Sequence, residues 1–396
     1  MLVYFLVDIF VLLMLIVGEV NNRYLKNISK ITIIMVFFIF TGLSYKIHND
    51  MYLYEMLFNT VHFSDIGNII MEPGFVFLNS VANAIFSFHV FKALIYFLFT
   101  IILYKSLKEF SLREDEIVFV FALLFLIPMF YLLSFSAFRQ FIAIGIFFYA
   151  LKYLLYGQNI KYFLFILLAS LFHISAIILF LLPFLFKYYK KDFYRDIILV
   201  TGSFILANTP ILNSLIHKIV LLLLPSIPRL STYADSMVNN GLHISLFNMA
   251  ILFLSYVTVF IYNKKRFYTN IDNFIYKGSM VFFILFFIGL KLNIFYRIEL
   301  YFYIFLALNI TFLLRNFKKN NAYYLLKYFI ILLLITQDIK HIASKYHEDE
   351  SLIPYHSYIE TFFYNIPYNK TAQYNHMYNK WGRVDLKYLP VLKKEK

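Results

Sequence analysis

The sequence predicts an all-α fold, a polytopic bundle of transmembrane helices. Of its 396 residues, 61% are hydrophobic and only 15% are charged, whereas a soluble domain is nearer half apolar and a quarter charged. The mean hydropathy is +0.71. Apolar runs long enough to cross a bilayer recur from one end of the chain to the other. We therefore expect about ten to twelve membrane passes.

The charge pattern orients this bundle. The net charge of +14 does not indicate nucleic-acid binding, because the basic residues lie in short loops between apolar runs. Short basic loops face the cytoplasm, which assigns that side to residues 23–30, 105–113, 157–161, 187–195, 263–266 and 315–319. The chain has no cysteine, which excludes a disulfide framework, a Cys-ligated zinc and a thiol nucleophile.

The first two spans, at 2–18 and about 31–45, lead to an acid-rich segment, 46–88, that we expect outside. It carries Asp50 and ends in Glu72-Pro73-Gly74, where Pro73 suits the first turn of a helix. Residues 75–88 are apolar but interrupted by Asn and Ser. They predict either a full span or an amphipathic helix at the outer interface. The basic loop 105–113 favours the interfacial helix, because a crossing would place that loop outside.

The next outer turn contains the sequence SFSAFRQ, after spans at 89–103 and 117–133, the latter with an expected kink at Pro128. Arg139 is the only charged residue between Glu116 and Lys152. It opens a span at 141–152, so its charge adds to the positive end of the helix dipole. With Gln140 beside it, Arg139 predicts a site for phosphate or carboxylate. The alternative is an arginine that anchors the helix to lipid headgroups.

Residues 162–186 form one long apolar run that contains His173. Both flanks are basic, so the run is either a single tilted span or a hairpin of two short arms. A hairpin places His173 near its apex and implies a cavity, because broken helices in a membrane need cover by protein or water. His173 could equally be a polar group satisfied inside the bundle.

The remaining spans are expected at 197–213, 242–262, 275–290, from about Arg297 to residue 314, and at 322–336. Between the first two lies a second large outer segment, 214–241, with Arg229 and Asp235. A shorter outer turn carries Arg297 and Glu299. We thus predict a membrane domain over 1–338, with outer loops at 46–88 and 214–241, and a polar outer tail over 339–396.

Each candidate residue also has a structural interpretation. The outer arginines suit a phosphate or pyrophosphate but could be interfacial anchors. Glu72 could be a helix N-cap, Glu299 could pair with Arg297 or a lysine, and Asp50 could belong to a solvated loop. The sequence has no His pair at metal-ligand spacing, no P-loop and no GxSxG motif. The lack of these motifs argues against an ATP-driven pump, a nucleotide-sugar enzyme and a serine hydrolase.

Four stretches resemble the EpsG family of bacterial polysaccharide proteins, a branch of the Wzy-type polymerases of O-antigen and capsule repeat units. They are Glu72-Pro73-Gly74-Phe75, SFSAFRQFIAIGIFFYALKY, LASLFHISAIILFLLPF and YRIELYF. They occur in the order that the family shows and extend from about residue 45 to 315. The motifs are short, and the segment around Arg229 and the polar tail match no pattern that we can name.

The resemblance implies a multi-pass glycosyltransferase of the bacterial inner membrane that needs neither metal nor cofactor. Its donor would be a glycan on undecaprenyl pyrophosphate, and its acceptor the terminal sugar of another lipid-linked repeat unit. Membrane lipid and a chain-length regulator protein would be its partners. A flippase of the same lipid-linked glycan and an O-antigen ligase are the alternatives.

The resemblance also suggests roles for the candidate residues. Arg139 with Gln140, Arg297 and Arg229 would bind pyrophosphate or glycan, and Glu299 would lie among them. A general base must activate the acceptor hydroxyl. The candidates are Glu72, His173 and Asp50, in that order, with Glu299 and Asp235 behind them.

Overall fold

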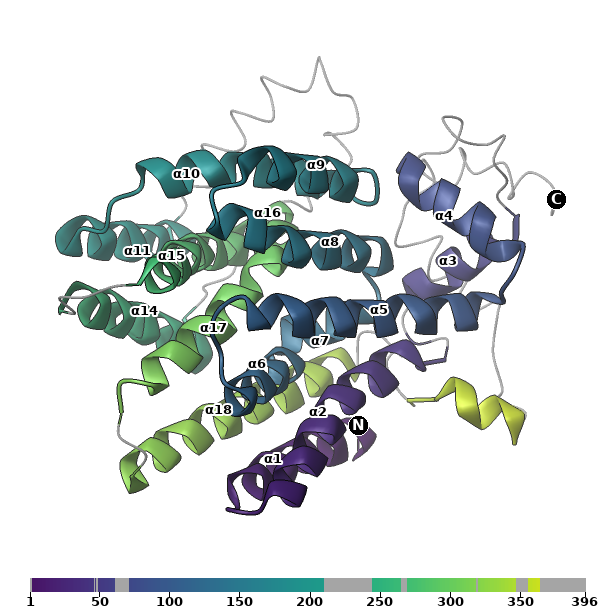
Figure 1. The fold of residues 1–396 in the computed structure, drawn as a ribbon, viewed down its shortest axis with the longest axis horizontal. Helices are drawn as coiled ribbons and strands as arrows, with labels where there is room; N and C mark the ends of the chain where they lie inside the picture. The colour runs from purple at the N-terminus through teal and green to yellow at the C-terminus, as the bar shows by residue number, and fades with distance from the viewer. Residues whose placement is uncertain are drawn as a thin grey trace. The chain divides into compact units, whose positions relative to one another are not determined.

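The computed structural model describes residues 2–45, 47, 49–60, 71–209, 244–264, 269–317, 320–346 and 355–363. Within these ranges the regular elements are helices (Figure 1). The β contact among them is an isolated bridge between Ser44 and Ser357. The chain divides into two compact units. Unit 1 is Met1–Ile177 with Phe329–Lys396, and unit 2 is Ile178–Tyr328.

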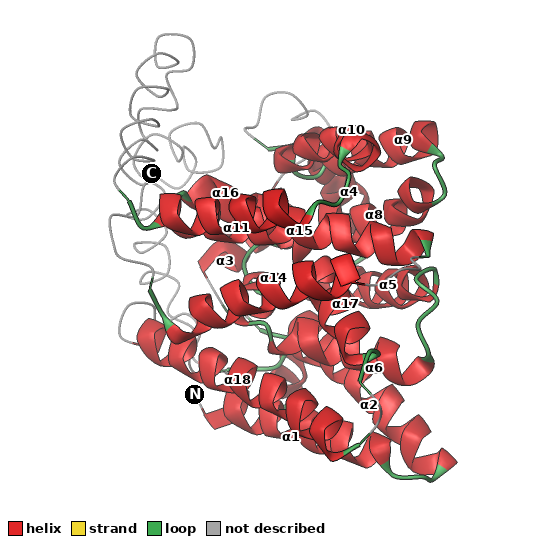
Figure 2. Ribbon diagram, turned by 90° about the vertical axis from the view of Figure 1, so that its left-hand side faces the viewer, coloured by secondary structure: helices red, strands yellow, loops and turns green. Residues whose placement is uncertain are grey.

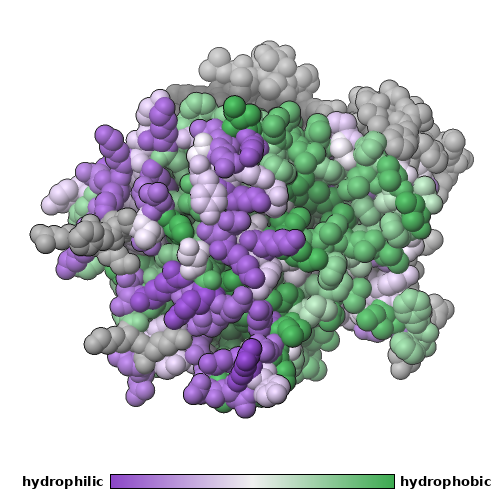
Figure 3. Space-filling view, in the orientation of Figure 1, coloured by the Kyte–Doolittle hydropathy of each residue, from purple (hydrophilic) through white to green (hydrophobic). Residues whose placement is uncertain are grey.

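Unit 1 contains the N-terminal helices and part of the C-terminal tail. Its elements are α1 Leu2–Glu19, α2 Arg23–Gly42, α3 Asn49–Thr60, α4 Pro73–Asn83, α5 Phe88–Lys108, α6 Glu114–Leu126, α7 Pro128–Ser134, α8 Phe138–Leu155, α9 Asn159–Ser170 and η5 Tyr358–Phe362. Neighbours such as α1 and α2, or α8 and α9, pack side by side. The outward surface of α5 is apolar, with Val90, Leu94, Phe97 and Leu98 exposed (Figure 3), as expected for a helix that faces lipid.

Unit 2 contains the later helices. They are α10 Leu182–Tyr188, α11 Phe193–Ala207, α14 Leu246–Lys264, α15 Asn270–Lys291, α16 Asn293–Glu299, η3 Leu300–Phe302 and α17 Tyr303–Leu314. Helix α17 is buried along its whole length, so it forms the core of this unit. Two elements, η2 Ile174–Leu181 and α18 Asn321–Tyr346, cross the boundary between the units.

Eight of the described helices are long and apolar enough to cross a membrane. They begin at Leu2, Arg23, Phe88, Phe138, Leu246, Asn270, Phe295 and Asn321. The prediction of an all-α, multi-pass membrane fold is therefore confirmed.

Basic side chains gather at one end of unit 1, which we call the basic end. Lys30 lies 2.6 Å and Lys108 3.7 Å from the carboxylate of Glu114. The hydrogen bond from Lys30 lowers the pKa of Glu114. The α5–α6 and α8–α9 loops lie on this same side (Figure 2), and Tyr156 donates to Glu109 across it at 3.1 Å.

The opposite end of unit 1 is built from aromatic side chains. Helices α5 and α8 run in the same direction, since Phe91 contacts Phe138 near their starts and Phe99 contacts Phe148 further along. Phe138 also meets Tyr54 of α3 at a ring separation of 5.9 Å. We call this the Glu72 end, because α4 begins there. These aromatic residues of unit 1 thus serve packing.

Several expected boundaries agree with the structure. Helix α4 has 11 residues, roughly 16 Å at 1.5 Å per residue, too short to span a bilayer. The helix before SFSAFRQ breaks at Ile127, and α7 begins at Pro128. The apolar run around His173 also breaks, because α9 ends at Ser170 and η2 begins at Ile174. The residues after Ile177 belong to unit 2.

The last span is longer than expected. Helix α18 runs to Tyr346, ten residues beyond the expected end at 336. Hydropathy falls at Gln337, but the helix continues because the next residue, Asp338, is fully buried inside unit 1. Tertiary packing has overridden the local composition here.

A segment of the tail packs back onto unit 1. The Tyr355 ring stacks on Phe40 at 4.2 Å, and its hydroxyl donates to the Phe40 carbonyl at 2.9 Å. The Tyr45 N–H donates to the carbonyl of His356, and the Tyr358 N–H to that of Leu43. Residues 355–363 are therefore attached at the C-terminal end of α2. The second outer segment, 214–241, lies outside the described residues.

Candidate functional site

The centre of the site is an ion pair between Arg139 and Glu72. Arg139 is the second residue of α8, and its guanidinium donates through a terminal nitrogen to Glu72 Oε2. The two side chains are 12% and 14% exposed. Glu72 occupies the N-cap position of α4 but makes no side-chain cap hydrogen bond. The expected arginine at a helix start is present, and its partner is a carboxylate 67 positions away.

The second carboxylate oxygen of Glu72 ties the ion pair to the break near His173. Glu72 Oε1 accepts from the backbone N–H of Ile174 at 3.2 Å, at the start of η2. The N–H of Gly74 donates to the carbonyl of Leu171 at 2.9 Å. A Cβ atom on Gly74 would lie 2.8 Å from that carbonyl oxygen. The Glu-Pro-Gly turn therefore needs glycine, because its backbone packs against the turn after α9.

Aromatic side chains flank the guanidinium. Its carbon lies 5.8 Å from the ring centre of Tyr54 and 5.9 Å from that of Phe75. The Tyr54 hydroxyl lies 3.5 Å from Arg139 Nε. Aromatic faces attract a cation at such distances, so α3 and α4 hold the guanidinium from two sides.

Gln140 follows Arg139 in α8, and His173 lies in the turn between α9 and η2, directly before Ile174; both side chains are buried. The imidazole Nδ1 of His173 is 2.6 Å from the hydroxyl of Ser175, two residues further along the chain. This contact is therefore made within the turn itself. Asp50 lies in the first turn of α3, one helical turn before Tyr54, and hence on the same face of that helix. Unit 1 thus holds Glu72, Arg139, Gln140, His173 and Asp50.

The other candidates are in unit 2 or beyond the described ranges. Arg297 lies on α16 and is exposed. Glu299 is buried, and it accepts a hydrogen bond from the hydroxyl of Tyr303. The sequence suggested Arg297 or a lysine as its partner, and the contact found is a tyrosine one helical turn away. Arg229 and Asp235 lie outside the described residues.

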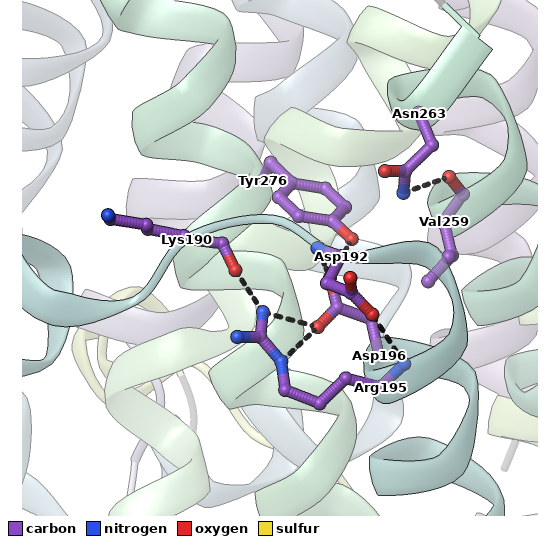
Figure 4. Close-up of polar contacts among 7 residues, drawn as sticks. All are labelled: Lys190, Asp192, Arg195, Asp196, Val259, Asn263 and Tyr276. Carbon is purple, nitrogen blue, oxygen red and sulfur yellow. Dashed lines mark hydrogen bonds and ion pairs between the residues drawn. The ribbon is translucent and has the colours of Figure 1, made fainter.

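Sequence reasoning missed a buried carboxylate in unit 2. Asp196 has no exposed surface and accepts from the Tyr276 hydroxyl at 2.5 Å and the Asp192 N–H at 3.1 Å (Figure 4). Arg195 donates to it through two nitrogens, at 3.1 and 2.8 Å. This network joins α11 to α15 and satisfies the carboxylate, so its role is structural. In the sequence, the sign of this buried carboxylate was an aspartate directly after the basic loop 187–195.

A second missed group lies at the Glu72 end of unit 1. Lys92, on α5, is 2% exposed. Its ammonium donates to the Ser44 carbonyl and, at 2.9 Å, to the Ser44 hydroxyl. Ser44 also forms the bridge to Ser357. Lys92 thereby stabilises the end of α2 to which the tail segment is attached.

The geometry of the Glu72–Arg139 pair suits the binding and release of an anion. An arginine fork can bind phosphate through two parallel hydrogen bonds, and the first N–H groups of α8 add a favourable dipole. A carboxylate beside it can accept a proton once the arginine is engaged elsewhere. Within the ranges that the structure describes, no three His, Asp or Glu side chains converge as metal ligands.

Comparison with known proteins gives one relationship. Neither a curated protein nor a solved structure matches the chain. Residues 27–357 match the sequence model of the EpsG family. The matched range contains the Glu72–Arg139 pair and extends over most of the chain, so this protein belongs to the EpsG family.

Proposed function

We propose that this protein joins undecaprenyl-pyrophosphate-linked oligosaccharide repeat units at the outer face of the bacterial inner membrane. Membership of the EpsG family supports a polymerase-type role in polysaccharide biosynthesis, and the eight apolar helices make it a multi-pass membrane protein. The observation that carries the proposal is the partly buried Glu72–Arg139 pair at the end of unit 1 opposite the basic loops. The positive-inside rule favours the cytoplasm for the basic end, which supports an outer location for this pair.

In the proposed reaction, the pyrophosphate of the donor takes the place of Glu72 on the Arg139 guanidinium. Glu72 remains held by the Ile174 N–H and gains a free oxygen that can accept a proton. The acceptor hydroxyl gives its proton to Glu72, and its oxygen attacks the anomeric carbon of the donor. The bond from that carbon to phosphate breaks, and undecaprenyl pyrophosphate leaves with its charge stabilised by Arg139.

The other candidates have supporting roles in this proposal. Arg297 is exposed in unit 2 and remains a prediction for the glycan or pyrophosphate. Arg229 and Glu299 remain predictions for the same substrate, and His173 and Asp50 remain alternatives to Glu72 as the base. A chain-length regulator is the expected protein partner.

The first test is the length of surface glycan in a strain that carries Arg139→Ala, with protein abundance measured in parallel. We expect normal amounts of protein and glycan of a single repeat unit, because repeat units would still be made and exported but not joined. Arg23→Ala is the matched control. Arg23 is an exposed arginine at the start of α2, and its removal should leave long chains.

Two other results would contradict the proposal. Complete loss of surface glycan in the Arg139→Ala strain would favour a flippase or an O-antigen ligase, since each acts on all the glycan that reaches the surface. Long chains at normal protein level would remove Arg139 from the site and leave it as a headgroup anchor.

A further inference from the structure

Two lysines converge at the basic end of unit 1, where α8 and α9 meet. Lys152 lies in the last turn of α8, and Lys161 lies in the first turn of α9. The Lys152 ammonium is 3.9 Å from the ring centre of Tyr149 and 5.1 Å from that of Tyr153. The Lys161 ammonium is 5.7 Å from the same Tyr153 ring. Two positive charges from different helices therefore lie beside one aromatic ring.

The ring between these lysines is held by its neighbours. Tyr153 stacks on Phe165 of α9 at a ring separation of 5.3 Å, and Tyr149 contacts the same Phe165 at 5.0 Å. The two tyrosine rings lie 5.9 Å apart. The packing of α8 on α9 thus defines where the two ammonium groups lie. An aromatic ring attracts a cation but does not neutralise its charge.

Neither Lys152 nor Lys161 has a carboxylate at ion-pair distance among the residues that the structure describes. Glu109, at the end of α5, acts on Lys152 electrostatically. Its carboxylate accepts a hydrogen bond from the Tyr156 hydroxyl at 3.1 Å. The two lysines therefore keep a positive charge that an anion can neutralise.

The surface that leads to these lysines is apolar. On α9, Leu164 and Leu168 are exposed and follow Lys161 by three and seven positions, a spacing that places all three on one face of the helix. Helix α8 packs against both α5 and α9 and lies between them (Figure 1). Hydrophilic side chains gather where α5 and α8 end (Figure 3). A positive pair at the end of an apolar, lipid-facing surface has the polarity of a phospholipid site.

We propose that Lys152 and Lys161 bind the phosphate of one anionic phospholipid at the basic end, with its acyl chains along Leu164 and Leu168. Basic pockets between transmembrane helices on the cytoplasmic side recognise anionic headgroups, and the positive-inside rule favours the cytoplasm for this end. The phosphate oxygens accept from both ammonium groups in charge-assisted hydrogen bonds. The lipid thereby offsets the repulsion between the two lysines.

The position of this site indicates what the lipid does. Helix α8 carries Arg139 at its start, and α9 ends at the turn that presents the Ile174 N–H to Glu72. The lipid binds at the other ends of these two helices, so it anchors the α8–α9 hairpin to the leaflet at the basic end. Its role is structural, and the proposal does not depend on the proposed reaction.

The test uses the full-length protein, purified in a maltoside detergent and stripped of native lipid. Thermal unfolding is followed as phosphatidylglycerol, or phosphatidylcholine with the same acyl chains, is added to the micelles. We expect phosphatidylglycerol to raise Tm by several degrees with a saturable dependence on its mole fraction, because a ligand that binds only the folded state stabilises it. Phosphatidylcholine should give a clearly smaller shift, since its headgroup also carries a positive charge. Glycerol phosphate, which lacks acyl chains, should give none.

Variants connect this shift to the site. The double variant Lys152→Gln and Lys161→Gln should fold, because neither side chain is fully buried, and it should lose the difference between the two lipids. The double variant Arg23→Gln and Lys26→Gln is the matched control. It removes the same charge from two exposed positions at the start of α2, and it should keep the full shift.

The proposal would be overturned if the two lipids raised Tm equally, which would indicate a general effect of hydrocarbon. It would also fail if the Lys152 and Lys161 variant kept the shift, or if the control variant lost it to the same extent, which would indicate attraction by net charge alone. A full shift with glycerol phosphate would identify a soluble anion instead of a lipid.

Discussion

At the scale of single residues, the central feature is a partly buried ion pair whose two members have different expected roles. Arg139 can bind an anion in either protonation state of its neighbour, whereas Glu72 can act as a base only when it is ionised and free. In the structure Glu72 contacts both the guanidinium and the Ile174 N–H. Glu72 could therefore transfer a proton or merely position Arg139, and substitutions can separate these two roles.

We predict that Glu72→Gln lowers the rate of chain extension at least about a hundredfold, the usual contribution of a positioned general base. The glutamine keeps the size of the side chain and an oxygen for the Ile174 N–H but cannot take up the proton. The measurement is the rate of repeat-unit joining in membranes supplied with lipid-linked repeat units. The Arg139→Gln variant and the double variant complete a double-mutant cycle.

The cycle has two distinct readings. If Glu72 is the base, the double variant should be slower than Arg139→Gln alone. If Glu72 acts only by positioning Arg139, the double variant should match Arg139→Gln, and the base must then be sought at His173 or Asp50.

At the scale of elements, the site depends on the close approach of α4 to the turn after α9. Gly74 makes this approach, with its N–H on the Leu171 carbonyl at 2.9 Å. The same turn presents the Ile174 N–H to Glu72. The start of the short helix α4 therefore brings together three parts of the chain: the Glu72 carboxylate, the Arg139 guanidinium and the turn between α9 and η2.

We predict that Gly74→Ala lowers stability by about 1–3 kcal/mol, the usual cost of inserting a methyl group into packed structure, and shortens the surface glycan. The added Cβ would lie 2.9 Å from the Cβ of Leu171, so the turn must move away from Glu72. Stability is measured by thermal unfolding in detergent, and glycan length on the same strain.

Gly202→Ala is the control for this substitution. Gly202 is also in a helix, α11, but a Cβ there meets no atom within 4 Å. Alanine should leave stability unchanged or slightly increased, because it has the higher helix propensity. Equal effects of the two substitutions would show that the contact with Leu171 is unimportant.

At the scale of the whole molecule, the question is which end of unit 1 faces the cytoplasm. The basic end holds Lys30, Lys108 and the α8–α9 loop, and the Glu72 end holds α3, α4 and the tail segment 355–363. The absence of cysteine from the sequence makes this question accessible, because each introduced cysteine is the only thiol in the chain.

We predict that a membrane-impermeant thiol reagent labels Asn59→Cys and Phe363→Cys in intact spheroplasts. Both positions are exposed, one on α3 and the other at the end of the tail segment. Gln158→Cys, exposed between α8 and α9 at the basic end, should react only after the membrane is permeabilised. Full labelling of the denatured variants controls for reactivity. The reverse pattern would place the Glu72 end in the cytoplasm and refute transfer outside.

Sequence alone determined the class of the protein and much of its linear order. Hydropathy along the chain is a local property, and it identified the multi-pass helical fold. Pro128 indicated the kink before SFSAFRQ, whereas for the run around His173 the sequence left a single tilted span and a broken hairpin as alternatives. Arg139 was evident for the same reason, since it is a solitary charge beside a long apolar run. The four short motifs were sufficient to indicate the family that the comparison then showed.

The tertiary structure decided which residues meet. Glu72 and Arg139 are 67 positions apart, and Phe40 and Tyr355, which stack on each other, lie near opposite ends of the chain. Nothing in the local composition pairs them, because such contacts depend on how helices pack. The extension of α18 past Gln337 has the same cause, since a buried partner surface outweighs the local drop in hydropathy. Periodicity and charge patterns depend on residues that are neighbours in the sequence. A functional site depends on the distances between residues that are far apart in the sequence, which only the packed structure determines.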